Sequence, residues 1–377
     1  MRKFKFDDIV INCTAKKKPT EEDKDTYLGL EHLDPESLEV KRFGSEVVPK
    51  GEKLLMEKGD ILFGKRRAYQ KKVAIAPFDG IFSAHGMVLR PKEDVICKEF
   101  FPFFISSDYF LDAAIKISVG SLSPTINWGD IKKLEFELPE IEEQKKLAEV
   151  LWALEMERRA ASKTLDAAIQ LKDSFAYELF NQLISISEET EEWPEVKLKT
   201  CITQKSKRNK NNEDYQVLSI SNKNGFVAQS DQFENGEVAS ENKSNYKIVE
   251  RDDFAYNPAR INVGSIARLT GYDNGVISPM YVCFTCGDKL LPEFMEQWLK
   301  TSVFKQQMLS RVAGSVRICL KYDAMEDISI KLPPIDEQSI IVSILNSMDE
   351  HIAKLEETFE QSLLLKKSVL KEVWADV

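Results

Sequence analysis

The sequence predicts an α+β fold that is built twice: two tandem mixed α/β domains, each followed by a long helix. The two helices are expected to pack as an antiparallel coiled coil with pseudo-two-fold symmetry. Three observations lead to this prediction. The 377-residue chain repeats itself, short β-type runs dominate two of its parts, and two long segments without glycine or proline have heptad spacing.

The internal repeat is clearest in two heptapeptides, LPEIEEQ and LPPIDEQ, which lie 194 positions apart. Around them, residues 120–144 align with residues 314–338 without a gap, and both segments begin with Gly-Ser. Further upstream, GDILFGKRRAYQKKVAIA aligns with DDFAYNPARINVGSIARL at an offset of 193, which places Arg67 over Arg260. A repeat of this length indicates one structural unit that is used twice.

Each copy begins with a mixed domain. Short β-type runs such as DILFG, KVAIA and GVISPMYVCF are separated by turn residues, and one helical stretch is expected in each domain, in KEFFPFFISSDYFLDAAI and in LPEFMEQWLKTSVFKQQML. Strands and helices do not alternate regularly, which argues against a doubly wound sheet. We therefore divide the chain into a first domain (1–138), a first long helix (139–187), a second domain (188–332) and a second long helix (333–377).

The two long segments have the spacing of helices that face a partner helix. Seam residues recur in alternating steps of four and three, in the same register in both segments. Proline is tolerated just before a helix, and the acidic residues that follow it favour the positive helix end. Equal length and register favour mutual packing over two unrelated surface helices. The predicted interface comprises Leu147, Leu151, Leu154, Leu165, Phe175, Leu179, Ile341, Leu345, Met348, Ile352, Leu355, Phe359 and Val369.

The composition is that of an ordinary globular protein, with 43% hydrophobic and 30% charged residues. No apolar run approaches the roughly 18 residues of a membrane span. The N-terminus, MRKFKFDDIV, lacks the apolar segment of a signal peptide, so we expect a cytoplasmic protein. The net charge of −10 argues against a uniformly basic nucleic-acid binder, although basic residues cluster locally, as in Lys65-Arg66-Arg67.

The cysteines and histidines do not predict a metal site. Cys283 and Cys286 lie in an apolar β-type run, SPMYVCFTC, where residues three apart point to opposite faces, so we expect a core strand there. The three histidines lie far apart in the sequence. We expect His85 in a β-type run and His351 on the polar flank of the helical seam, both with structural or solvated roles.

Several motifs, taken in order and in duplicate, resemble one family. They are GDILFG…SAHGMVLRP, FAYNPARINVGSI and the twice-used LP-x-I-(E/D)-E-Q before a long heptad helix. This family is the specificity subunit of type I restriction-modification enzymes, and the resemblance covers the whole chain. It implies two target-recognition domains that each read one half of a split site on double-stranded DNA, and an antiparallel helix pair that separates them and docks partner subunits.

The resemblance also implies that this chain has no catalytic role and no cofactor of its own. Modification subunits of the family methylate adenine with S-adenosylmethionine. Restriction subunits use ATP and Mg to translocate and cut DNA.

Candidate DNA contacts come from comparing the two halves. Residues common to both halves cannot distinguish different half-sites and suit scaffold or phosphate contacts, whereas base reading is expected where the halves differ nearby. Arg and Lys suit guanine, and Asn suits adenine. The common residues are Arg67 with Arg260 and Ser121 with Ser315; the differing ones are Lys65, Arg66 and Tyr69 in the first domain and Asn262, Arg317 and Lys321 in the second.

Two alternatives stay open on the sequence. The chain could be a scaffold whose paired helices assemble partners without reading DNA, or the specificity chain of a related bifunctional system with another nuclease partner. A methyltransferase is disfavoured, because YNPA at 256–259 departs from the Asn-Pro-Pro-aromatic motif and no glycine-rich cofactor loop precedes it.

Overall fold

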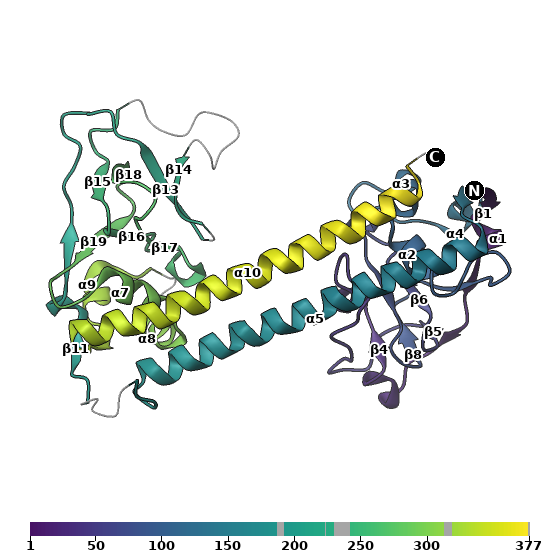
Figure 1. Ribbon diagram of the computed structural model, residues 1–377, viewed down its shortest axis with the longest axis horizontal. Helices are drawn as coiled ribbons and strands as arrows, with labels where there is room; N and C mark the ends of the chain where they lie inside the picture. Colours follow the sequence, from purple (N-terminus) through teal and green to yellow (C-terminus); the bar gives the residue numbers. More distant parts are fainter. Residues whose placement is uncertain (187–191, 223, 230–241, 313–318, 376–377) are drawn as a thin grey trace. The chain divides into compact units, whose positions relative to one another are not determined.

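The computed structural model describes residues 1–186, 192–222, 224–229, 242–312 and 319–375. It consists of two units: unit 1 is Met1–Lys163 with Glu357–Val377, and unit 2 is Thr164–Glu356. Each unit holds one mixed domain and a segment of both long helices (Figure 1), so the predicted α+β class with tandem domains is confirmed. Within the described residues, no helix has the length and apolar content that crossing a membrane requires.

The domain of unit 1 contains two four-stranded sheets and a two-stranded ribbon. The sheet orders are β2-β9-β6-β7 and β3-β5-β8-β4, and only β4 and β8 pair in parallel. The strands are β1 (Arg2–Lys5), β2 (Val10–Cys13), β3 (Lys16–Lys17), β4 (Tyr27–Leu28), β5 (Lys53–Met56), β6 (Ile61–Phe63), β7 (Val73–Ile75), β8 (Gly80–Phe82), β9 (Met87–Pro91) and β10 (Glu135–Leu138). The ribbon joins β1 to β10, immediately before the first long helix.

The domain of unit 2 has the same plan. Its sheet orders are β12-β19-β16-β17 and β14-β13-β18-β15, with β13 and β18 parallel, and its ribbon joins β11 to β20. The strands are β11 (Glu195–Lys197), β12 (Ile202–Lys205), β13 (Val217–Ser221), β14 (Gly225–Ala228), β15 (Lys247–Glu250), β16 (Phe254–Tyr256), β17 (Ile266–Arg268), β18 (Asn274–Ile277), β19 (Val282–Cys286) and β20 (Ser329–Lys331). The sequence repeat is therefore a repeat of sheet topology.

The helical stretch predicted in each domain is in fact two short helices. Unit 1 has α2 (Phe101–Ser106) and α3 (Asp108–Lys116), and unit 2 has α7 (Pro292–Leu299) and α8 (Ser302–Val312). The break falls on Ser107 and on Thr301, 194 positions later, whose hydroxyls accept the N–H of residues 110 and 304. These side chains cap the second helix, and a cap needs an extended backbone that interrupts the first.

Short helices and 3-10 turns complete the domains. The helices are α1 (Phe6–Ile9), α4 (Trp128–Ile131) and α9 (Tyr322–Glu326), and the 3-10 turns are η1 (Glu21–Lys24), η2 (Leu30–His32), η3 (Ala68–Gln70), η4 (Leu198–Thr200) and η5 (Ile261–Val263).

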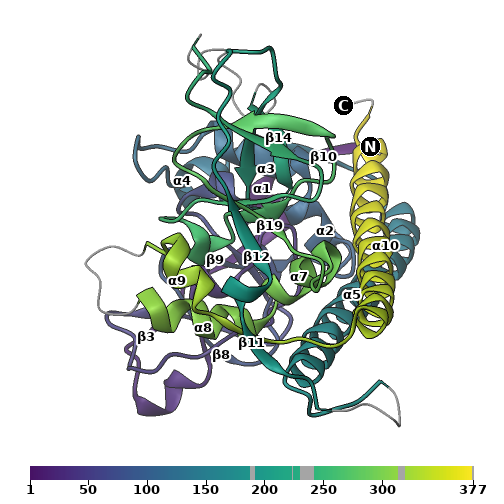
Figure 2. The same ribbon diagram turned by 90° about the vertical axis from the view of Figure 1, so that its left-hand side faces the viewer.

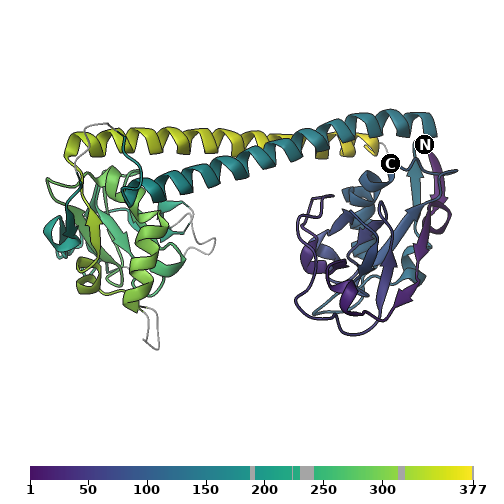
Figure 3. The ribbon, with the colours of Figure 1, turned by 90° about the horizontal axis from the view of Figure 1, so that it is seen from below.

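The two predicted long helices are present as α5 (Ile141–Phe180) and α10 (Ile335–Val373), of 40 and 39 residues. Helix α5 begins two residues after Pro139, and α10 begins directly after Pro334, where a proline is tolerated. In each unit the sheets lie to one side of the helix segments (Figure 3). The boundaries 1–138, 139–187, 188–332 and 333–377 stay a prediction, since the two units divide both helices rather than following the chain order.

The last residue of each heptapeptide ties its long helix to the domain. Gln144 is 1% exposed; its Oε1 accepts the N–H of Cys97 at 2.8 Å, and its Nε2 donates to the carbonyls of Pro139 (2.8 Å) and Val95 (3.3 Å). We call this arrangement the glutamine bridge. It holds the first turn of α5 against the segment that leads into α2.

Gln338 makes the same bridge in unit 2. Its Oε1 accepts from Leu291, and its Nε2 donates to Pro333 and Lys289, all at 2.8–2.9 Å. Each partner is 194 positions after its unit 1 counterpart. Figure 2 looks onto unit 2, where α7 lies beside α10 and the amide of Gln297 donates to Asn346 at 2.8 Å.

Cores rich in aromatic residues hold each domain to its helix segments. In unit 1, Phe100, Phe104 and Phe136 share one buried cluster with Leu151 of α5 and Leu370 of α10. Burying each such side chain contributes about 1.5–3 kcal/mol. In unit 2 the equivalent cluster joins residues of α7 and α8 to Leu179 of α5 and to Ile341 and Leu345 of α10.

The predicted cysteine strand is confirmed as β19. Cys283 is buried in the cluster of the second sheet, and Cys286 packs against the main core of unit 2, so the two side chains lie on opposite faces. This is the alternation expected of a strand buried on both faces.

Candidate nucleic-acid interface

Three loops of the unit 1 domain meet at one place, which we call the three-loop junction. They are the β6–β7 loop (64–72), the β8–β9 turn (83–86) and the α3–α4 loop (117–127). Backbone hydrogen bonds join them: Arg66 donates to His85 (3.2 Å), Arg67 donates to Pro124 (2.7 Å), and Ile126 donates to Lys65 (3.0 Å). Loops joined by main-chain bonds present their side chains in a defined arrangement.

Local backbone geometry explains how the chain reaches this junction. Arg67 has φ 54° and ψ 50°, the left-handed region that costs a non-glycine residue free energy. The bond to Pro124 and the closely packed Ala68 hold it there. Gly86 closes the β8–β9 turn, where an added Cβ would lie 2.1 Å from the Phe82 ring. The turn can therefore approach the β6–β7 loop only with glycine at this position.

The junction is electrostatically positive. Burial and the nearby charge of Lys16 lower the pKa of Lys65. Burial, Arg66 and Lys65 together lower the pKa of His85, whose Nε2 lies 3.4 Å from Nη1 of Arg66. Cations that disfavour one another's charge mark a site where an anion would be stabilised.

Within the residues that the structure describes, unit 2 repeats two backbone hydrogen bonds of this region. The N–H of Leu320 donates to Pro258 at 3.0 Å, which repeats the Ile126–Lys65 bond. In the β18–β19 turn, Tyr281 donates to Ser278 at 3.1 Å, as Gly86 donates to Ser83 in unit 1. The backbone differs at the aligned arginines, since Arg260 has φ −132° and is not left-handed. The scaffold is thus shared, whereas the details of its loops are not.

The structure brings all five predicted unit 1 contact residues to the junction. Arg66, Arg67, Tyr69 and Ser121 are exposed, and Lys65 is half-buried. In unit 2, Arg260 and Lys321 are exposed and Asn262 is half-buried on η5. Ser315 and Arg317 lie outside the described residues. Contact of any of these residues with DNA stays a prediction.

The prediction that His85 lies in a β-type run was wrong. His85 does not lie in a strand: it is exposed in the turn between β8 and β9, beside Arg66. The apolar residues on both sides of SAHG suggested one continuous β-type run. The Ser-x-x-Gly spacing is the signal that would have indicated a turn. The structure therefore adds His85 to the candidate interface.

None of the predicted helix-pair residues is fully exposed, and their role as the interface between the two helices stays a prediction. Leu151, Leu179, Ile341 and Leu345 are buried, and the other predicted seam residues are half-buried. In unit 1, Glu155 pairs with Lys366 and Arg158 lies over Phe359, so the α5 and α10 segments run in opposite directions.

Within each unit, an ion pair between described residues connects the two helix segments. In unit 1, Glu155 is 0% exposed and bonds Lys366 at 2.8 Å and Arg158 at 2.9 Å. In unit 2, Lys172 pairs with Asp349. At the offset of 194, Glu155 aligns with Asp349 and Lys172 aligns with Lys366. The carboxylate therefore comes from α5 in unit 1 and from α10 in unit 2, and the lysine comes from the other helix in each case.

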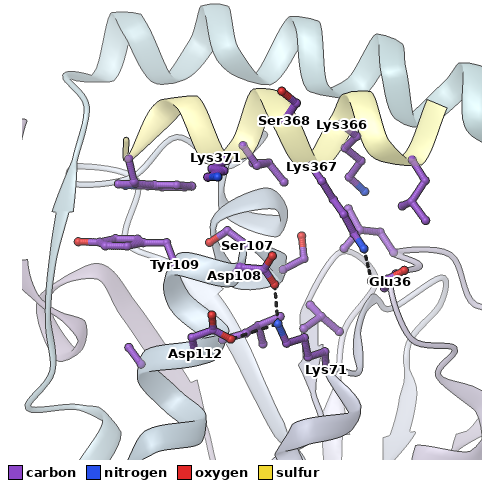
Figure 4. Close-up of a pocket in the computed structure, with 18 of the residues that line it drawn as sticks. Glu36, Lys71, Ser107, Asp108, Tyr109, Asp112, Lys366, Lys367, Ser368 and Lys371 are labelled. Atoms are coloured by element: carbon purple, nitrogen blue, oxygen red, sulfur yellow. Dashed lines mark hydrogen bonds and ion pairs between the residues drawn. The ribbon is translucent and has the colours of Figure 1, made fainter. Parts of the chain in front are cut away.

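Each unit also has a groove beside its domain. In unit 1 the groove lies between the domain and α10, and in unit 2 it lies between the domain and α5. The unit 1 groove, of about 780 Å³, is lined by α3, the β6–β7 loop and the last turns of α10 (Figure 4). Lys71 bonds Asp108 across its floor, Lys367 pairs with Glu36, and Tyr109 stacks on Trp374 at 4.9 Å.

The unit 2 groove, of about 1070 Å³, occupies the equivalent place. Lys172, Thr301 and Ile266 line it at the positions that Lys366, Ser107 and Val73 have in unit 1. The internal repeat has thus duplicated this groove.

The comparisons with known proteins agree with this duplication. The family described as "Type I restriction modification DNA specificity domain" matches the chain twice, over residues 3–171 and 194–364. The chain is also similar in structure to the type I restriction-modification S subunit from M. genitalium, with a TM-score of 0.59 and 14% identity over 99% of this chain and 95% of that one.

A second similar structure describes complex assembly and conformational transition of the type I R-M system. The TM-score is 0.56, with 16% identity over 99% of this chain and 97% of that chain. At such identities the likeness of the structures shows the fold alone. The two family matches, in contrast, cover most of the sequence and coincide with its two halves. The chain therefore belongs to the type I restriction-modification DNA specificity family.

Proposed function

We propose that this chain is the sequence-reading subunit of a type I restriction-modification system and that its two domains read the two halves of a split DNA site. The observation that supports the proposal is the three-loop junction of unit 1, which the described residues of unit 2 repeat in part, with different side chains at aligned positions. A common scaffold suits the phosphate backbone, which is the same at every sequence, and the differing side chains suit base edges.

The proposed role is not catalytic. Partner subunits would supply adenine methylation with S-adenosylmethionine and the ATP- and Mg-dependent steps, in the cytoplasm. Modification subunits would dock on the helix pair and its two equivalent grooves. A duplicated groove with matching positions gives two copies of one partner the same contacts.

Mapping of methylated adenines in DNA modified by the chain with its modification subunits tests the proposal. We expect one split motif with a fixed spacer. Arg66→Ala should relax only the first half-site and Arg317→Ala only the second, with a cost of about 1–3 kcal/mol for each lost base contact. Lys58→Ala, an exposed cation in the turn before β6, serves as the matched control and should leave both half-sites unchanged.

Other outcomes would revise the proposal. Equal weakening on all sequences by Arg66→Ala would make Arg66 a phosphate contact. Salt-dependent binding without any sequence preference in the wild-type complex would favour a scaffold that does not read DNA.

A further inference from the structure

We infer that Leu122 is an apolar wedge that enters the DNA between neighbouring base pairs of the first half-site. This inference rests on the proposed function and adds a mode of recognition to it. Leu122 is 91% exposed, and no other large apolar side chain in the described part of the chain is exposed to this extent. Exposed apolar side chains are common singly, so the surroundings of Leu122 must show that it has a role.

The first relevant feature is the shape of the loop that carries Leu122, which we call the tip loop (119–125). Val119 and Thr125 exchange two backbone hydrogen bonds, at 3.0 and 2.9 Å, and close the loop at its base. Gly120 at φ 115° begins the turn, a conformation that favours glycine. Leu122 therefore stands at the middle of a small closed loop rather than in a long unsupported segment.

The second feature is the attachment of the tip loop to the basic residues of the junction. Pro124, two residues after Leu122, accepts the Arg67 N–H, and Thr125 forms a β-bridge with Arg66. Phosphates bound at Arg66, Arg67 and Lys65 would thus lie beside the tip loop. An apolar tip flanked by cations is the combination that proteins use to unstack a base step while holding the backbone on either side.

The third feature is chemical. The other side chains at the middle of the loop, Ser121 and Ser123, are small, so Leu122 is the largest group there. The aligned residue of the second half, Val316, is also apolar, although its placement lies outside the described residues. An apolar residue at this position in both halves suits a contact with the apolar faces of bases and does not suit one with phosphate.

Fluorescence of 2-aminopurine tests the wedge, because this base brightens when it loses its stacking partner. Duplexes carry it at each adenine of the first half-site in turn, and they are bound by the chain together with its modification subunits. We expect a rise in fluorescence at one step for the wild type. Leu122→Ala should abolish the rise and weaken binding by roughly tenfold, the value of one buried leucine side chain.

Two variants serve as controls. Leu122→Met keeps an apolar side chain of similar size and should restore both the fluorescence and the affinity. Val47→Ala removes an exposed apolar side chain from a loop of the same domain that is not part of the three-loop junction, and it should change neither.

Each remaining outcome counts against the wedge. Unchanged fluorescence and affinity in Leu122→Ala would remove Leu122 from the interface. Lost discrimination at a thymine without any fluorescence change in the wild type would replace the wedge with a methyl contact in the groove. If the wild-type complex binds DNA without any sequence preference, the proposed function fails as well. Binding of the wild-type complex alone reveals this outcome, so it is distinguished from a failure of the wedge alone.

Discussion

Gln144 and Gln338 show at the scale of single residues why the chain repeats one heptapeptide. A buried side-chain amide needs partners for its oxygen and its nitrogen, and here both are supplied by main-chain groups of one loop and one helix start. Only glutamine has the length and the two kinds of hydrogen-bonding group that this place requires.

Removing the glutamine bridge should destabilise the unit that contains it. Gln144→Ala leaves the N–H of Cys97 and the carbonyl of Pro139 buried without a partner, and we expect a loss of about 2–4 kcal/mol in the free energy of unfolding. Denaturant titration measures this loss. Glu143→Ala, the exposed neighbour, is the control and should change stability by less than about 0.5 kcal/mol. A small effect of Gln144→Ala would show that water replaces the amide.

At Tyr256 we expect a substitution to increase the stability of the protein. Its side chain is fully buried, and its hydroxyl has no hydrogen-bond partner within the described residues. The aligned residue of the first half is Phe63, which is equally buried. Tyr256→Phe should therefore raise the free energy of unfolding by about 1 kcal/mol, because a desolvated hydroxyl is removed.

The reciprocal variant tests the same argument. Phe63→Tyr introduces a buried hydroxyl and should lower stability in unit 1. Thermal unfolding of both variants gives the comparison. A lower melting temperature for Tyr256→Phe would mean that the hydroxyl has a partner in solution.

At the scale of elements, the heptad pattern predicted a seam along each long helix. It did not predict that charges would be buried there. Arg158, Lys172 and Lys366 occupy seam positions in the sequence, and the structure places each of them beside a carboxylate of the same unit. Polar residues in a helix seam specify register and direction at a cost in stability.

Removing one member of the buried group in unit 1 should be costly. Glu155→Ala leaves Lys366 and Arg158 buried without an anion, so we expect a loss of about 3–5 kcal/mol in the free energy of unfolding. Replacing all three residues by leucine or methionine should recover most of this loss. Glu157→Ala, exposed on the same helix, is the control. Equal stability of Glu155→Ala and wild type would show that the ion pair does not form.

The same group predicts a pH dependence. Burial alone would raise the pKa of Glu155, but the hydrogen bond from Arg158 and the charge of Lys366 outweigh it and lower the pKa to about 2. A carboxylate whose pKa is lower in the folded state contributes stability above its unfolded value of about 4.5, and the contribution disappears as the pH falls toward 2. Wild type should lose about 3 kcal/mol more than Glu155→Gln over this range. Parallel curves would contradict the prediction.

At the scale of the whole molecule, the duplication agrees with the symmetry of DNA. The backbone of B-DNA has approximate two-fold axes, and a protein with two related halves can present the same scaffold to both half-sites. Under the proposed function, the differences between the halves would allow the two half-sites to differ in sequence. The family match to both halves is consistent with this reading.

If the proposed function holds, we expect the helix pair to set the length of the DNA between the two half-sites. Adding one heptad to both α5 and α10 lengthens each helix by about 10 Å, which corresponds to about three base pairs of DNA. We expect the methylated motif to keep both half-sites and to gain a longer spacer. Inserting seven residues into the loop at 45–50 is a control that should leave the spacer unchanged. An unchanged spacer in the helix variant would contradict the idea that the helices measure it.

By itself, the sequence determined the duplicated α+β plan, the two long helices and the family. These follow from local and periodic signals: a repeat at a nearly constant offset, β-type runs between turn residues, and seven-residue spacing without glycine or proline. Such signals depend on neighbours along the chain, so they can be read without knowing the fold.

Only the tertiary structure decided which distant residues meet. It placed His85 beside Arg66, joined the loop of Leu122 to that of Arg67, and paired Glu155 with Lys366. These contacts join residues between 19 and 211 positions apart, and no periodic pattern specifies them. They arise because tertiary folding brings together loops of one domain and segments of two helices that are remote in sequence, and the packing of the core determines which of them touch.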